Sequence, residues 1–117
     1  MEIYRFDKAV GKPINLFSSN FSLMPIIKQE MKHIHIACMQ LETEGVIGFH
    51  EAATNQLLLV IQGEGWVRGE AEQRIKIQAG EAAFWRQGEG HETTTKEGLT
   101  AIVIEGEDLN PEQMTRK

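Results

Sequence analysis

Short segments with the two-residue period of β-strands, separated by turn residues, account for almost all of this 117-residue chain. Arg74–Gln78 is the clearest example, because isoleucines alternate there with charged or amide side chains, and His33–Leu41 alternates without a break. Glycine-containing turns follow at close spacing, among them Gly63–Gly65, which predicts a tight hairpin turn. Many short strands and almost no helix predict an all-β sandwich or barrel.

Three segments add detail to this pattern. The strand predicted over Gln56–Gln62 is apolar on both faces, so a second sheet, a partner subunit or both must cover its back. Asn20–Ile27 is predicted to be extended, with Pro25 near an edge or a bend. The one helix signal begins at Asn110, a capping residue followed by proline, and it is too short to be stable unless it docks.

Charge and composition exclude several classes of partner. The formal net charge of −5 argues against a nucleic-acid partner, because such proteins usually carry a basic surface. The longest apolar run, Leu57–Ile61, is too short to span a membrane, and the N-terminal residues have no apolar signal segment. The single cysteine, Cys38, cannot form an internal disulfide and is expected to be a small buried thiol. We therefore expect a cytoplasmic protein with no membrane partner.

Two stretches place glycine and histidine at fixed offsets that resemble the paired motifs of the cupin superfamily. The first contains Gly45, His50, Gln56 and Gly63, and the second contains Gly80, Gly88 and His91. The resemblance implies a double-stranded β-helix, also called a jelly-roll barrel. It further implies a single domain over residues 1–117, with a motif-bearing core at about 41–105, a short tail at 106–117, and a homodimer.

The resemblance also implies where a site would lie. In most active cupins three histidines and one glutamate hold a divalent transition metal inside the barrel. Here His50 and His91 occupy histidine positions, Ala52 fills the second histidine position, and Gln56 replaces the glutamate. Two imidazoles and an amide would leave the charge of a divalent cation uncompensated.

Two glutamates adjoin the motif histidines in the sequence. Strand alternation turns Glu51 and Glu92 to the opposite face, and only a local bulge would bring either inward. If no metal is bound, the two histidines are either inward-facing groups bonded to Gln56, Thr93, Thr95 or water, or direct contacts to an organic ligand.

Other side chains extend the candidate site. Trp85 either fills the barrel or coats a ligand pocket, and Arg86 either binds a carboxylate or phosphate or is a solvated charge at a strand end. His33 and His35 share a face with apolar residues, so we expect a half-buried structural pair, with a role at the cavity or the subunit contact as the alternative.

Three functions remain open from the sequence. The first is a small cupin that binds a small polar or acidic molecule through His50, Gln56, His91, Trp85 and Arg86. The second is a metal-dependent isomerase or oxygenase with a reduced shell of His50, His91 and Gln56. The third is a non-catalytic assembly protein whose barrel is filled by core side chains such as Leu58 and Val60.

Overall fold

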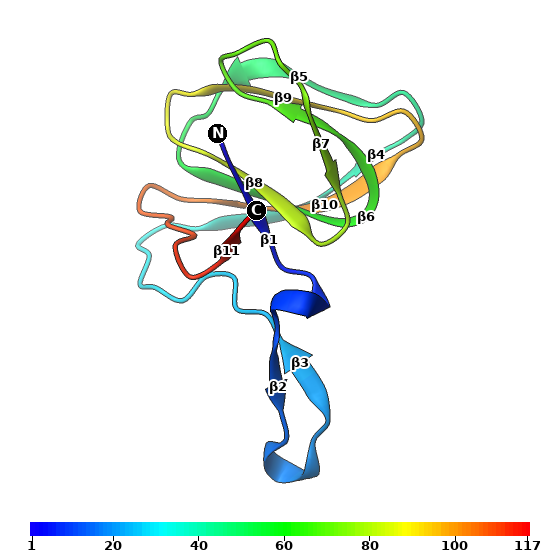
Figure 1. Cartoon of the computed structure of the whole chain (residues 1–117). Coiled ribbons are helices and arrows are strands. Elements are labelled where there is room, and N and C mark those ends of the chain that lie inside the picture. The colour runs from blue at the N-terminus through cyan, green and yellow to red at the C-terminus, as the bar shows by residue number, and fades with distance from the viewer.

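The computed structural model describes residues 1–117 as an all-β molecule with two short 3-10 helices, η1 (Lys8–Val10) and η2 (Leu16–Ser18) (Figure 1). The strands are β1 (Glu2–Arg5), β2 (Lys12–Ile14), β3 (Phe21–Leu23), β4 (His35–Leu41), β5 (Val46–Glu51), β6 (Gln56–Arg68), β7 (Ile75–Gln78), β8 (Glu81–Trp85), β9 (Gly90–Thr94), β10 (Leu99–Glu105) and β11 (Thr115–Arg116). None of its helical segments has the length and hydrophobicity needed to cross a bilayer.

The long strand β6 belongs to both layers of the barrel. Its first half pairs with β8 and β10, in a layer ordered β11-β1-β8-β6-β10-β4. Its second half pairs with β7 and β9, and β9 continues the other layer to β5. All these pairings are antiparallel. One strand therefore closes the two layers into a barrel, which is the architecture that the resemblance to cupins implied.

The predicted hairpin at Gly63–Gly65 is wrong, because β6 runs through these residues without reversing. The ladder to β10 shifts register opposite Thr100, and Gly63 has a φ of +83°. A Cβ on Gly65 would lie 2.2 Å from the carbonyl oxygen of Thr94. The two glycines thus let β6 bend and let the neighbouring backbone approach closely. Apart from turns, this is a common role of glycine in a sheet.

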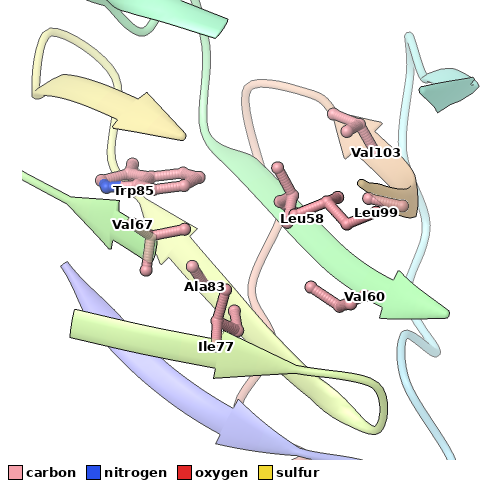
Figure 2. Close-up of a cluster of buried hydrophobic side chains, with 9 residues drawn as sticks. Leu58, Val60, Val67, Ile77, Ala83, Trp85, Leu99 and Val103 are labelled. Carbon is pink, nitrogen blue, oxygen red and sulfur yellow. The ribbon is translucent and has the colours of Figure 1, made fainter. Parts of the chain in front are cut away.

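The interior of the barrel is filled by hydrophobic side chains from both layers (Figure 2). The buried members are Leu58, Val60, Val67, Ile77, Ala83, Trp85, Leu99, Ala101 and Val103. Met39, Leu41 and Ile47 pack against them. Alternation places these residues on the inward face of their strands.

A second apolar cluster lies on the outer face of the β8–β6–β10 layer, formed in part by Leu57, Leu59 and Phe84. Residues 57–60 are buried on both faces of the sheet, which confirms that this strand is covered on both sides. The outer cover comes from this chain's own tail, through Leu109 and Met114. Ile61, the next residue, is 50% exposed.

The helix predicted after Asn110 is absent. The amide of Glu112 donates to the Asn110 side chain at 3.1 Å, and the amide of Met114 donates to the Pro111 carbonyl at 2.8 Å. These bonds close one turn only. The chain then pairs with β1 as β11, and this pairing prevents a second helical turn.

The N-terminal part contains a two-stranded hairpin, β2–β3, that stands apart from the barrel (Figure 1). We call residues 12–23 the arm. The extended segment predicted over Asn20–Ile27 is shorter than expected, since β3 ends at Leu23 and residues 24–27 form no strand. Pro25 follows the strand end, consistent with its missing backbone donor.

Two expectations for β4 are wrong. Cys38 is exposed, on the outer face of this edge strand. His33 and His35 are also exposed, and the Nδ1 atom of His35 lies 3.6 Å from a carboxylate oxygen of Glu105. Alternation is as predicted, and Cys38 is exposed because it lies on the face opposite to partly buried Ala37. His35 shares the face of Ala37, and it is exposed at the first residue of the strand.

Candidate functional site

His50 and His91 lie directly opposite each other where β5 pairs with β9. Their ring centroids are 4.4 Å apart and the rings are tilted by 53°. His91 is 1% exposed, whereas His50 is exposed. The pairing register shifts between Ile47 and His50, and this irregularity turns His50 toward His91. Two distant segments therefore bring both predicted histidines together at one end of the barrel.

Backbone carbonyls orient both imidazoles in the same way. Nδ1 of His50 lies 2.7 Å from the Gly48 carbonyl oxygen, and Nδ1 of His91 lies 3.3 Å from that of Glu89. A carbonyl only accepts, so in the neutral rings the proton is on Nδ1 and Nε2 carries the free lone pair. The site thus presents two nitrogen acceptors.

Two buried polar atoms on the inward face of β9 have no hydrogen-bond partner within the protein. They are Nε2 of His91 and Oγ1 of Thr93. The next inward hydroxyl, that of Thr95, donates to the Glu64 carbonyl at 2.7 Å and is satisfied. One interpretation of the sequence had both histidines hydrogen-bonded to Gln56, Thr93, Thr95 or water. Neither Gln56 nor Thr93 forms such a bond in the structure. Buried polar atoms without partners are rare in native proteins, so this pair marks a place for a ligand or solvent.

Burial lowers the pKa of His91 below 6.5, and the neighbouring His50 lowers it further, while the hydrogen bond to Glu89 raises it. In the unfolded chain the pKa of His91 returns to its ordinary value. Below 6.5 the unfolded state therefore binds the proton first, and His91 lowers the free energy of unfolding as pH falls through this window. Above 6.5 it contributes no pH dependence.

We expect chemical denaturation to show this effect as a difference between two proteins. The free energy of unfolding of wild type should fall more steeply below pH 6.5 than that of His91→Phe. The carboxylates common to both proteins cancel in the comparison. Parallel curves for the two proteins would contradict the lowered pKa.

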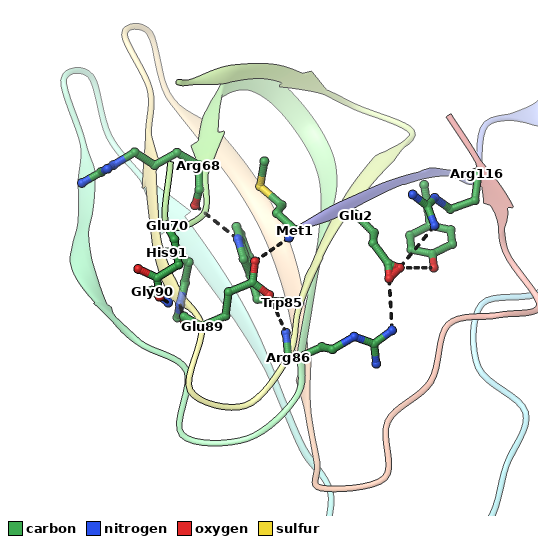
Figure 3. Close-up of polar contacts among 11 residues, drawn as sticks. Met1, Glu2, Arg68, Glu70, Trp85, Arg86, Glu89, Gly90, His91 and Arg116 are labelled. Carbon is green, nitrogen blue, oxygen red and sulfur yellow. Dashed lines mark hydrogen bonds and ion pairs between the residues drawn. The ribbon is translucent and has the colours of Figure 1, made fainter. Parts of the chain in front are cut away.

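Trp85 lies beside His91 and is completely buried (Figure 3). Its ring centroid is 4.7 Å from that of His91, and its indole nitrogen donates to the Arg68 carbonyl at 3.2 Å. It comes from the opposite layer of the barrel, on β8. Trp85 therefore joins the two layers and forms one wall of the site.

The remaining predicted residues do not join this group. Gln56 is 8% exposed and pairs in register with Trp85, and it makes no hydrogen bond to either histidine. Arg86 is exposed on the outer face, where its guanidinium lies 3.2 Å from Glu2 and 5.4 Å from the ring of Phe84. This placement favours a solvated charge at the strand end over a role in ligand binding.

The donors at this site do not fit a metal centre. Ala52 is buried and supplies no donor, and no group of three or more histidine, cysteine or acidic side chains is placed to hold an ion. Glu92 turns outward, as alternation predicted, and accepts from Arg68 at 3.3 Å and from Arg74 at 3.1 Å. Glu51 is exposed. Two imidazoles alone fall short of the three protein ligands of ordinary catalytic sites.

Five cavities are lined by other residues, and neither His50 nor His91 lines any of them. Core side chains fill the barrel below the pair.

Sequence reasoning missed the backbone that shapes this site. Gly48 supplies the carbonyl that holds His50, and a Cβ on Gly90 would lie 2.3 Å from the ring of Phe49. That ring also lies 4.3 Å from the guanidinium of Arg68. One signal was present: the spacing from Gly45 to His50 departs by one residue from the cupin motif, and the ladder breaks within that interval.

No family model and no curated protein sequence matches this chain. Among solved structures, a cupin superfamily protein from Desulfitobacterium hafniense has a TM-score of 0.61 at 17% identity, over 72% of this chain and 75% of that one. A cupin-2 domain containing protein from Shewanella frigidimarina has a TM-score of 0.56 at 26% identity, over 70% and 78%. The chain has the fold of the cupin superfamily. A DMSP lyase from Ruegeria pomeroyi shares this cupin fold, with a TM-score of 0.59 at 19% identity, over 66% of this chain and 40% of the lyase.

Proposed function

We propose that this cupin binds one small polar molecule at the end of its barrel formed by His50 and His91. The observation that carries the proposal is the buried Nε2 atom of His91, which has no partner within the protein and lies beside the His50 ring. With both Nδ1 atoms directed at carbonyls, each of the two adjacent rings keeps a free acceptor nitrogen, and the Thr93 hydroxyl adds a third polar atom on β9. A molecule with hydroxyl or amide donors satisfies these acceptors.

The electrostatics favour a neutral donor over an acidic ligand. A carboxylate would need an imidazolium as its donor, and burial lowers the pKa of His91 and so disfavours that form. Arg86, for which binding of an acid was one of two alternatives, is turned to the outer face and paired with Glu2. We therefore propose hydroxyl- or amide-bearing ligands as the class.

The test follows the imidazole resonances of the two histidines by NMR during titration with small diols, amides and carboxylic acids. We expect a compound with hydroxyl or amide donors to shift both resonances in wild type and to have no effect on the His50 resonance in His91→Phe. Phe17→Leu is the control, because Phe17 is 96% exposed on the arm, which stands apart from the barrel. Its response should equal that of wild type.

The same His91→Phe variant is expected to be more stable than wild type by about 1 kcal/mol, because it removes an unsatisfied buried acceptor. The Glu89 carbonyl keeps a partner, since the Ala52 amide donates to it at 3.0 Å. A gain of stability with a loss of binding would identify a group retained for function. Chemical denaturation of both proteins measures the difference.

A second candidate function is assembly without a barrel ligand. The observation that favours it is the filled interior, because neither His50 nor His91 lines any of the five cavities. If no compound shifts the imidazole resonances and His91→Phe leaves stability unchanged, this candidate replaces the first. The donor set supports no metal-dependent step. Near-stoichiometric metal in protein purified without chelator, lost in His50→Ala, would overturn that conclusion.

A further inference from the structure

The arm presents large apolar side chains that no other part of this chain covers. Phe17 at its tip is 96% exposed and Leu16 is 63% exposed. Phe21 and Leu23, on the returning strand, are 51% and 47% exposed. A two-stranded hairpin is marginally stable by itself in water, and this one is paired with no other strand. The arm therefore needs a surface to pack against.

The backbone conformation at the tip of the arm also indicates that the arm has a binding partner. Phe17 has a φ of 58° and a ψ of 37°, in the left-handed region that bulky residues rarely adopt. Such strain persists where it serves a purpose, and here it holds an aromatic ring out into solvent.

The same molecule carries an apolar groove of about 590 Å³ on the outer face of the β6–β10–β4 layer. Nine of its ten lining residues are hydrophobic, among them Ile34, Ile36 and Ile61, which are each half or more exposed. β4 is the edge of its layer, so this groove lies beside a strand that is paired on one side only. An exposed apolar face at a sheet edge is a site for association.

Charge on the arm and on the groove is complementary. The arm carries one lysine, Lys12, and no acidic residue, and Lys8 and Lys28 flank it in the sequence. Residues 105–112 contain four acidic residues and no basic one. This acidic segment borders the groove, because Gln29 lines the groove and donates to the Asp108 carbonyl at 2.7 Å. The basic arm therefore complements the acidic rim of another copy better than it complements itself.

The exposed area also matches a dimer. The four arm side chains and the three groove isoleucines are each about half or more exposed. A whole aromatic side chain buries roughly 150–250 Å², so the set presents several hundred Å² of apolar surface. Together with the polar residues around the groove, this apolar surface approaches the roughly 800 Å² that each partner contributes to a standard interface.

We propose that a second copy of this chain occupies the groove: the arm of each copy lies in the apolar groove of the other, about a two-fold axis. Such an interface is reciprocal, with Phe17 of one copy contacting Ile36 of its partner, and the converse. The contact involves neither His50 nor His91, so this inference is independent of the ligand proposal and is tested separately. It assigns the surface of the expected homodimer.

The mass of the full chain in solution tests the proposal, by light scattering or sedimentation over a dilution series. We expect a dimer for wild type, and at least about tenfold weaker dimerisation for Phe17→Glu and for Ile36→Glu. Val46→Glu is the matched control, because Val46 is 61% exposed on β5 in the other layer. It should dimerise as wild type does. Circular dichroism checks that each variant is folded.

Cross-linking then tests which surface receives the arm. Phe17→Cys and Ile36→Cys are made in separate chains, each also carrying Cys38→Ser, and the chains are mixed and oxidised. We expect a disulfide between the two different chains, and none between Phe17→Cys and a Val46→Cys chain. A monomeric wild type overturns the proposal, as does a dimer that Phe17→Glu leaves intact. A dimer lost in Val46→Glu alone assigns the interface to the other layer and also overturns it.

Discussion

Replacement of Trp85 with alanine is expected to lower the free energy of unfolding by about 3–5 kcal/mol, which is the usual cost of deleting a buried aromatic ring. Trp85 is completely buried, packs within the barrel core, and contacts His91 across to the other layer. Its loss leaves a cavity between layers and leaves the Arg68 carbonyl without its indole donor. For a domain of this size the midpoint of thermal unfolding should fall by on the order of 10–20 °C.

The chain contains its own control for this prediction. Trp66 is partly exposed on the outer face of β6, where the Lys76 ammonium lies 5.9 Å from its ring. Trp66→Ala should cost no more than about 1.5 kcal/mol, because little of the buried core changes. Equal losses in the two variants, measured by chemical denaturation, would show that Trp85 does not join the layers in the way described.

Alanine at Gly65 is expected to cost about 3 kcal/mol or more, because the added methyl group meets backbone. Its Cβ would lie 2.2 Å from the Thr94 carbonyl oxygen and 2.8 Å from a methyl carbon of Leu99. The first of these contacts cannot be relieved by rotating a side chain, so β6 and β9 must separate. Because β6 belongs to both layers, the strain spreads through the barrel.

Gly48→Ala is the matched control for this substitution. No atom lies within 4 Å of a Cβ placed on Gly48, and its φ lies outside the left-handed region. The free energy of unfolding should change by less than about 1 kcal/mol, with stabilisation allowed by the stiffer unfolded chain. If Gly65→Ala proved as harmless as Gly48→Ala, the close approach of β6 to β9 would be wrong.

The candidate site was predictable where residue spacing decides side-chain direction. His50 and His91 meet as the motif spacing implied, and Glu92 turns outward as strand alternation required. Arg86 was not decided by sequence, because a residue just past a strand end can turn either way until its neighbours are known. The carbonyls that set both imidazole tautomers belong to the backbone, which a sequence pattern does not describe.

The errors concern segments whose state depends on distant partners. The glycines at 63 and 65 carry a turn signal, and only pairing with β7, β9 and β10 shows that the strand bends instead. The tail after Asn110 has a helix signal, and pairing with β1 ends it after one turn. Cys38 lies on an apolar strand as expected, yet it is exposed on the face of β4 opposite to partly buried Ala37.

The order of residues alone determined the β-strand content and the outward direction of Glu92, because alternation and turn chemistry are local properties. Only the tertiary structure decided that Nε2 of His91 is buried without a partner and that the arm stands apart from the barrel beside an apolar groove. Both features arise from contacts, or missing contacts, between segments far apart in the chain. Burial and pairing of that kind are properties of the whole packed molecule, and no local pattern encodes them.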